Sequence, residues 1–159
     1  MTGNVDSPIA LNDFLGFRVT EVSPERVIVE WTIGPEHLQP FGIPHGGTYC
    51  AVHEFAGSLA GIAWINRDRS PDDLQVPVVG TNNTTDFLRQ AKVGDTITTT
   101  ATPIHRGRTQ QLWRLESADQ NGRLIAQGQM RLANLPVVMA SPEMGAPPAG
   151  TMGAASGGQ

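Results

Sequence analysis

The sequence predicts an α+β domain in which an antiparallel β-sheet of about six strands wraps around one long central helix. Three observations indicate this fold. Two strand-like segments precede a single helical segment, four strand-like segments follow it, and short turn-like separators join the strands. The length of 159 residues and the hydrophobic content of 39% suit one soluble domain with a proper core.

The first two strands are expected within residues 11–33. The segments FRVTEV (17–22) and RVIVEWTI (26–33) are separated by SPE, a typical turn sequence. In the second segment, Val27, Val29, Trp31 and Ile33 alternate with mostly polar residues. This period of two predicts a strand that is buried on one face only.

Residues 47–66 are predicted to form the helix. Apolar side chains recur there at spacings of three and four, at Val52, Phe55, Ala56, Leu59, Ile62 and Ala63. The opposite side carries small residues instead of charges, which predicts a helix that is buried nearly all round. Small residues also let a sheet approach a helix closely, although each glycine costs about 1 kcal/mol of helix propensity.

Four further strands are expected in residues 76–88, 94–106, 108–119 and 122–135, separated by KVGD, HRGR and DQNGR. The folded domain is therefore predicted to span residues 11–135. Residues 1–10 are expected to be a flexible N-terminus. Residues 136–159 are rich in Pro, Gly and Ala and are expected to be a disordered tail.

Composition narrows the possible partners and the compartment. The net charge of −4 gives no reason to expect nucleic acid or an anionic membrane as partner. A single cysteine, Cys50, excludes an internal disulfide and a cysteine-based zinc site. The sequence shows no apolar run of membrane-spanning length and no signal-peptide pattern, so a cytoplasmic location is expected.

One acidic residue, Glu54, stands inside the apolar helical segment. Burial of a carboxylate costs several kcal/mol of free energy unless a partner compensates it. Glu54 lies seven residues after Gly47, two helical turns, and so returns to the same face. Free N–H groups of Gly46 and Gly47 at the helix start would suit a developing oxyanion, and a partly dehydrated carboxylate is a better base. The alternative is an interface carboxylate paired with an Arg or with the segment TNNTT.

The segment PHGG, followed by an acid seven positions after its second glycine and then by four strands, resembles the hotdog-fold acyl-CoA thioesterases. The likeness covers roughly residues 11–134 and points to the phenylacetate-pathway and 4-hydroxybenzoyl-CoA branch. It implies hydrolysis of an acyl-CoA thioester, with Glu54 as base or nucleophile. Because many phenylacetate-type members carry Asp at the acidic position, Glu54 favours the 4-hydroxybenzoyl or 1,4-dihydroxy-2-naphthoyl side.

The resemblance also implies roles for residues around Glu54. His45 would fix the loop or orient the thioester, Gln39 would lie near the carbonyl, and Ser58 would hold the attacking water. Each has a plainer alternative: His45 as a helix cap or loop hydrogen bond, and Ser58 as a small residue chosen for close packing. The loop that carries Gln39 varies between branches of the family.

Coenzyme A requires groups that bind phosphates and amides. Arginine binds phosphate well, so Arg106 and Arg108 in HRGR, together with Arg89, are candidates. The alternative for the HRGR segment is a solvated hairpin turn. The resemblance further implies that the segment GTNNTTDFLR follows the pantetheine arm, whose amides would bind to strand backbone and to Asn82, Asn83 or Thr84.

Exposed sheet edges favour pairing between chains, and the resemblance implies a homodimer or homotetramer with the site at the subunit interface. No cofactor is expected. His37, His45, His53 and His105 show no metal-ligand spacing, so no metal is expected either. Two other functions stay open: a noncatalytic hotdog protein that binds acyl-CoA or a small aromatic ligand, and a dehydratase of the same fold.

Overall fold

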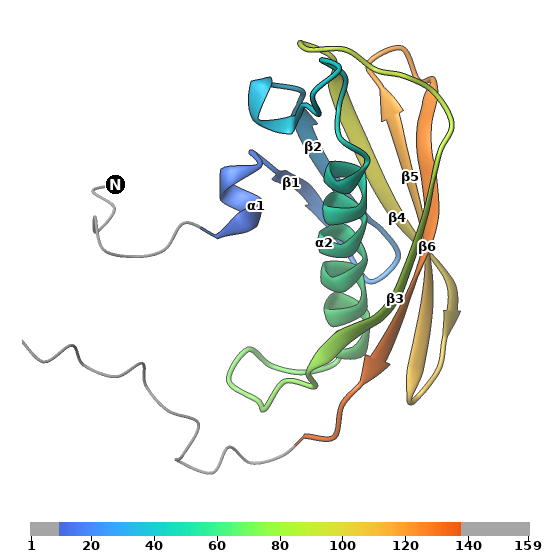
Figure 1. Cartoon of the computed structure of the whole chain (residues 1–159). Coiled ribbons are helices and arrows are strands. Elements are labelled where there is room, and N and C mark those ends of the chain that lie inside the picture. Colours follow the sequence, from blue (N-terminus) through green and yellow to red (C-terminus); the bar gives the residue numbers. More distant parts are fainter. Residues whose placement is uncertain (1–9, 138–159) are drawn as a thin grey trace, which may run out of the picture.

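A computed structural model describes residues 10–137 of the chain. It contains six strands, two α-helices and a short 3₁₀ helix (Figure 1). Their bounds are α1 Leu11–Phe14, β1 Arg18–Val22, β2 Val27–Thr32, η1 Pro35–His37, α2 Gly46–Ile65, β3 Val78–Phe87, β4 Thr96–Arg106, β5 Gln110–Asp119 and β6 Leu124–Asn134. The predicted flexible N-terminus and disordered tail lie almost entirely outside the described residues.

The strands form one antiparallel sheet in the order β1-β2-β4-β5-β6-β3. The helix α2 lies along one face of this curved sheet, as Figure 1 shows. The arrangement confirms the predicted hotdog fold, and every predicted strand segment contains a strand. Helix α2 begins and ends one residue earlier than predicted, because His45 is its N-cap.

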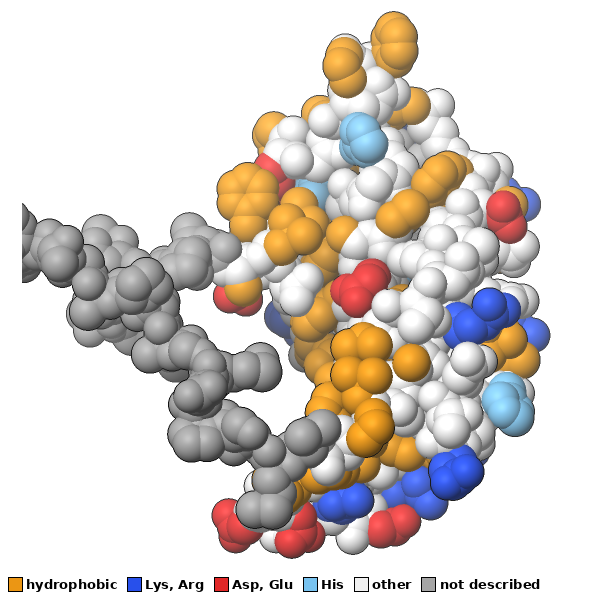
Figure 2. Space-filling model, turned by 60° about the horizontal axis from the view of Figure 1, so that its bottom comes forward, with side chains coloured by type: hydrophobic (Ala, Val, Ile, Leu, Met, Phe, Trp, Pro, Cys, Tyr) orange, Lys and Arg blue, Asp and Glu red, His pale blue; other side chains and the backbone are white. Residues whose placement is uncertain are grey.

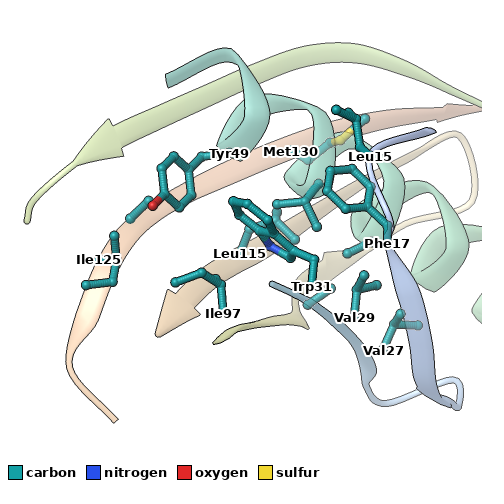
Figure 3. Packing of buried hydrophobic residues seen from close by; sticks show 14 of the residues in the cluster. Leu15, Phe17, Val27, Val29, Trp31, Tyr49, Ile97, Leu115, Ile125 and Met130 are labelled. Carbon is teal, nitrogen blue, oxygen red and sulfur yellow. The ribbon is translucent and has the colours of Figure 1, made fainter. Parts of the chain in front are cut away.

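The core fills the space between the sheet and α2. Alternate residues of β5 point into it, with Gln111, Trp113, Leu115 and Ser117 all buried. The alternation predicted for β2 is confirmed, because Val27, Val29 and Trp31 are buried and Ile33 just beyond the strand is too. Figure 3 shows the side chains of these strands meeting those of α2 and of the segment before β1, and Phe17 packs edge-on against Trp31.

The buried face of the helix overlaps only partly with the one that the sequence predicted, since Val52 and Ala56 are common to both. Its buried residues are Thr48, Tyr49, Val52, His53, Ala56, Gly57, Ala60 and Gly61. Phe55 and Leu59 are only half-buried, and Ile62 is 41% exposed, so the expectation of burial nearly all round is wrong for the single chain. The reason is close packing: a Cβ on Gly57 would lie 3.1 Å from the Met130 sulfur, so the small residues face the sheet.

Strand β3 is one edge of the sheet and pairs only with β6 among the described strands. Its pairing depends on Gly128 of β6, which lies opposite Thr85 of β3. A Cβ built on Gly128 would collide with the Thr84 carbonyl oxygen and would lie 3.2 Å from Nδ1 of His53. Gly128 therefore lets β3, β6 and α2 approach one another.

Gly128→Ala is accordingly expected to lower the free energy of unfolding by about 1–3 kcal/mol, because the added methyl group overpacks against backbone. Chemical denaturation of both proteins measures the difference. Gln127→Ala, an exposed position next to it in β6, serves as the control and is expected to change stability by less than about 0.5 kcal/mol. Equal stability of Gly128→Ala and the parent protein would contradict the close approach.

Candidate active site

The loop before α2 is held by a buried histidine. His37 accepts a hydrogen bond at Nδ1 from the Gly34 N–H at 2.8 Å, and its Nε2 lies 3.0 Å from the Leu15 carbonyl oxygen. The His37 carbonyl accepts a further hydrogen bond from the His45 N–H at 2.7 Å. These bonds fix the chain on both sides of the loop, so the start of α2 is placed by the core.

The first turn of α2 is capped by the side chain of His45. Its Nδ1 accepts a hydrogen bond from the Gly47 N–H at 2.8 Å, which is the cap that the sequence left as the alternative role. The expectation that both glycine N–H groups are free is therefore wrong for Gly47. The Gly46 N–H donates to no group within residues 10–137, which leaves it as the available donor at this helix end.

A cavity of about 630 Å³ opens beside this helix end. Four predicted site residues line it: Gln39, His45, Gly46 and Arg89. The remaining lining is mostly apolar, from Pro40, Ile43, Pro44, Tyr49, Phe87, Leu88, Gln90 and Ala91. The structure thus brings together the loop before α2, the first turn of α2 and the segment that follows β3.

Two aromatic rings form part of the cavity wall, because Tyr49 and Phe87 lie with ring centroids 6.2 Å apart. A Cβ on Gly46 would lie 2.8 Å from the Phe87 ring, so the glycine makes room for this wall. Burial, followed by the charge of Asp95, raises the pKa of Tyr49 to about 12, which keeps the phenol neutral. Gln39 is oriented by its own loop, since its Oε1 accepts from the Phe41 N–H at 3.0 Å.

Glu54 lies two turns further along α2 and does not line this cavity. Ser58 donates a hydrogen bond to Glu54 Oε1 at 3.0 Å, so the structure confirms that these two side chains share a face. The same oxygen lies 3.5 Å from the position that a Cβ on Gly80 of β3 would take. The carboxylate is exposed in the single chain, so the expected burial among apolar side chains is wrong. Its neighbours Phe55 and Leu59 pack partly against the core and do not cover the carboxylate.

A second buried titratable residue of the helix, besides Tyr49, is His53, which the sequence suggested only as a metal candidate. Its side chain is fully buried, and burial lowers the pKa of the imidazole to about 4. Nδ1 lies 3.1 Å from Thr85 Oγ1 and Nε2 lies 3.0 Å from Ser117 Oγ. A signal was present in the sequence, because Tyr49, His53 and Gly57 recur every four residues on one helix face.

The three candidate amide partners on β3 do not face one side of the sheet. Asn83 points toward α2 and donates a hydrogen bond from Nδ2 to the Cys50 carbonyl at 2.9 Å. Asn82 and Thr84 point to the outer face, and Thr84 donates to the Gln129 carbonyl of β6. A pantetheine arm on one side of β3 could therefore contact either Asn83 or the pair Asn82 and Thr84, but not all three.

The three arginine candidates are also separated. Arg89 lines the cavity, whereas Arg106 and Arg108 belong to the hairpin between β4 and β5, near the C-terminal end of α2 (Figure 1). Arg106 pairs with Glu25 at 2.8 Å and lies over the Trp64 ring at 5.7 Å. The helix of 20 residues is about 30 Å long, so one chain cannot bring this hairpin to the cavity.

Within residues 10–137, no group of three or more His, Cys, Asp or Glu side chains has an arrangement that could hold a metal ion. None of the helices in that range is both long enough and apolar enough to cross a membrane.

Residues 41–126, which include the loop before α2, the whole of α2 and the strands from β3 to β5, match the thioesterase superfamily. The chain belongs to the thioesterase superfamily. A protein of Mycobacterium tuberculosis named as an esterase, Rv1847, is 40% identical over 141 residues, which cover 85% of this chain and 97% of that protein. Its solved structure has a TM-score of 0.74.

Other superfamily members extend the comparison. The structure of AziG from S. sahachiroi is 42% identical, covers 79% of this chain and 96% of that one, and has a TM-score of 0.72. A 1,4-dihydroxy-2-naphthoyl-CoA hydrolase of Escherichia coli is 27% identical over 122 residues, with 77% of this chain and 84% of that protein covered. Membership of the superfamily confirms the expectation of a hotdog-fold thioester hydrolase.

Proposed function

We propose that this protein hydrolyses an acyl-CoA thioester with an aromatic or medium-chain acyl group to the free acid and CoA. The observation that carries the proposal is the pairing of Glu54 with Ser58 on α2, the helix whose first turn borders the cavity. Glu54 acts as general base toward a water held by Ser58, or attacks the carbonyl carbon itself. The Gly46 N–H donates to the carbonyl oxygen as negative charge develops on it.

The cavity supports this class of acyl group. Its wall is mostly apolar and includes the rings of Tyr49 and Phe87, against which a flat aromatic acyl group can pack. Gln39 and His45 present polar groups near the Gly46 N–H, where the thioester carbonyl would lie. Arg89 borders the same cavity, and we propose that it pairs with a CoA phosphate.

A second copy of the chain is proposed to complete the site. Glu54 lies about 10 Å along the helix axis from Gly47, so one chain does not enclose the carboxylate and the helix end together. Edge strand β3 lies beside Glu54, and Figure 2 shows exposed apolar side chains gathered on one face of the molecule. Ile62, two turns after Glu54 on α2, is exposed, and so is Phe87 at the end of β3. Unpaired strand edges and apolar patches of this kind favour association.

Size-exclusion chromatography with light scattering is therefore expected to give a homodimer or homotetramer, at least twice the chain mass of 17.0 kDa. Ile62→Glu is expected to shift the mass toward the monomer, because a charge on an apolar contact face opposes burial. Gln127→Glu on the outer face of the sheet is the control and is expected to keep the assembly. A monomeric and fully active parent protein would contradict a site shared between chains.

A panel of benzoyl-, phenylacetyl- and medium-chain acyl-CoA thioesters, with release of free thiol as the readout, tests the function directly. Hydrolysis of at least one aromatic or medium-chain thioester, with kcat/KM above about 10⁴ M⁻¹s⁻¹, is the expected result. Tight binding of the thioesters without release of CoA would favour the noncatalytic binding protein instead.

A further inference from the structure

A chain of buried polar side chains crosses the core beneath Glu54. It joins Thr99 of β4, Ser117 of β5, His53 of α2 and the edge strand β3 through Thr85 and Asn83. The distances are 2.8 Å from Thr99 Oγ1 to Ser117 Oγ, 3.0 Å from Ser117 Oγ to His53 Nε2 and 3.1 Å from His53 Nδ1 to Thr85 Oγ1. Thr85 then donates to Asn83 Oδ1 at 2.9 Å.

The direction of every bond in this chain can be deduced. A threonine hydroxyl has one hydrogen, and Thr85 uses it for Asn83, so Thr85 Oγ1 must accept from His53 Nδ1–H. The neutral imidazole then has no hydrogen on Nε2, which must accept from the Ser117 hydroxyl. Ser117 in turn accepts from Thr99. Burial of His53 favours this neutral ring.

This series of hydrogen bonds ends at the backbone of α2, one turn before the candidate catalytic carboxylate Glu54. Asn83 Nδ2 donates to the Cys50 carbonyl at 2.9 Å, so α2 is tied to β3 through both Cys50 and His53. Glu54 follows His53 directly, and Glu54 Oε1 lies 3.5 Å from the position that a Cβ on Gly80 of the same strand would take. These ties therefore set the rotation of α2 and its distance from β3 at the turn that carries Glu54.

We infer, building on the proposed hydrolysis, that His53 is a positioning residue, which links α2 to β3 as an Nδ1–H donor and thereby holds Glu54 in its reactive orientation. His53 touches no substrate in this role. Its loss acts on the chemical step through Glu54, and the acyl cavity, which it does not line, keeps its lining.

Steady-state kinetics of His53→Leu and His53→Asn test the inference on the full-length protein. Leu keeps an apolar volume but cannot donate to Thr85, so kcat is expected to fall about tenfold while KM stays within twofold. Asn places an amide N–H near the position of Nδ1 and restores the link to Thr85, so it is expected to recover most of kcat. Unchanged kcat in His53→Leu, or equal loss in both variants, would overturn the inference.

Gln111→Leu is the matched control, because it breaks another buried polar network further along α2. Gln111 donates to Asn134 Oδ1 at 2.6 Å and to the Gly61 carbonyl at 3.3 Å. This variant and His53→Leu are both expected to lower the melting temperature, but Gln111→Leu is expected to retain kcat. A loss of kcat in Gln111→Leu as large as in His53→Leu would reduce the role of His53 to general stability and overturn the inference.

A spectroscopic readout is independent of turnover. Long-range ¹H–¹⁵N correlation spectra of the labelled protein at pH 7 are expected to show His53 as a neutral ring with its hydrogen on Nδ1. A ring with its hydrogen on Nε2, or a doubly protonated ring, would overturn the inference. An inactive parent protein would overturn the proposed function itself, whereas an active parent with unaffected His53→Leu kinetics would overturn the positioning role alone.

Discussion

Glu54→Gln is expected to lower kcat for thioester hydrolysis by about 10³-fold, within the range of about 10²–10⁴ that general acid–base groups contribute. The amide keeps the shape of the side chain and can still accept the hydrogen bond from Ser58, but it can neither take up a proton nor attack the carbonyl. Because Glu54 is exposed in the single chain, the melting temperature of the variant is expected to change little. Thiol release under saturating substrate measures kcat.

Glu116→Gln provides the matched control for this experiment. Glu116 is an exposed carboxylate on the outer face of β5, away from α2, and its replacement is expected to leave kcat unchanged. Glu54→Ala extends the test, since it removes the carboxylate and its bond to Ser58 together. If both Glu54 variants hydrolyse the substrate at the parent rate, Glu54 has no catalytic role. The alternative hypothesis, that Glu54 is a carboxylate paired at a subunit interface, would then be favoured.

The free energy of unfolding is expected to be about 2 kcal/mol lower at pH 5 than at pH 7 through His53 alone. Burial lowers the pKa of His53 from 6.5 to about 4 in the folded protein. Between these values the unfolded chain binds the proton and the folded protein does not, so stability falls as the pH falls from 6.5 toward 4. Well above pH 6.5 both states are neutral and this contribution is constant.

Urea denaturation of the parent protein and of His53→Asn at pH 5, 6 and 7 measures this effect as the difference between two pH dependences. The variant has no imidazole at position 53, so its curve is expected to be flatter by about 2 kcal/mol over this range. Gln111→Leu is the control, because it destabilises the protein without altering the slope. Parallel curves for the parent and His53→Asn would contradict a neutral buried imidazole.

Carboxyl groups make the free energy of unfolding depend on pH in a lower pH range than His53 does. A hydrogen bond from Arg26 lowers the pKa of Glu21, and one from Gln120 lowers that of Asp95. A carboxyl with a lowered pKa stabilises the folded state above its unfolded pKa, and that stabilisation is lost as the pH falls below about 4.5. The interval between pH 5 and pH 7 therefore separates the histidine from these carboxyl groups.

Local patterns in the chain were sufficient for the fold class. The alternation of Val27, Val29 and Trp31 predicted a half-buried strand, and the strand-like segments on either side of one helix predicted the antiparallel sheet. The order of the strands was not predicted: KVGD joins β3 and β4, which lie apart because β3 pairs with β6. The sequence also predicted that the HGG segment begins the helix that carries Glu54, because the residue spacing of a helix is a local property. Ser58 was placed beside Glu54 for the same reason, and the structure has that contact.

Tertiary packing decided which face of α2 meets the sheet. By hydrophobicity, Phe55, Leu59 and Ile62 should face the core, yet the sheet packs on Ala56, Gly57, Ala60 and Gly61. Packing of a helix onto strands is limited by backbone separation, and small residues allow the closest approach. Successive residues of a helix point about 100° apart. The orientation of α2 that buries His53 therefore leaves its neighbour Glu54 exposed.

The same distinction explains the candidate ligands on β3. Residue types suggested amide partners at Asn82, Asn83 and Thr84, but the bulge between Gly80 and Asn82 sets which of them face α2. Arg89 follows the end of β3 and borders the cavity, whereas Arg106 ends β4 at the far end of α2, because β3 and β4 run in opposite directions. Strands and helix follow from nearest neighbours in the sequence, whereas facing, burial and hydrogen-bond direction depend on residues far apart in the chain that only packing brings together.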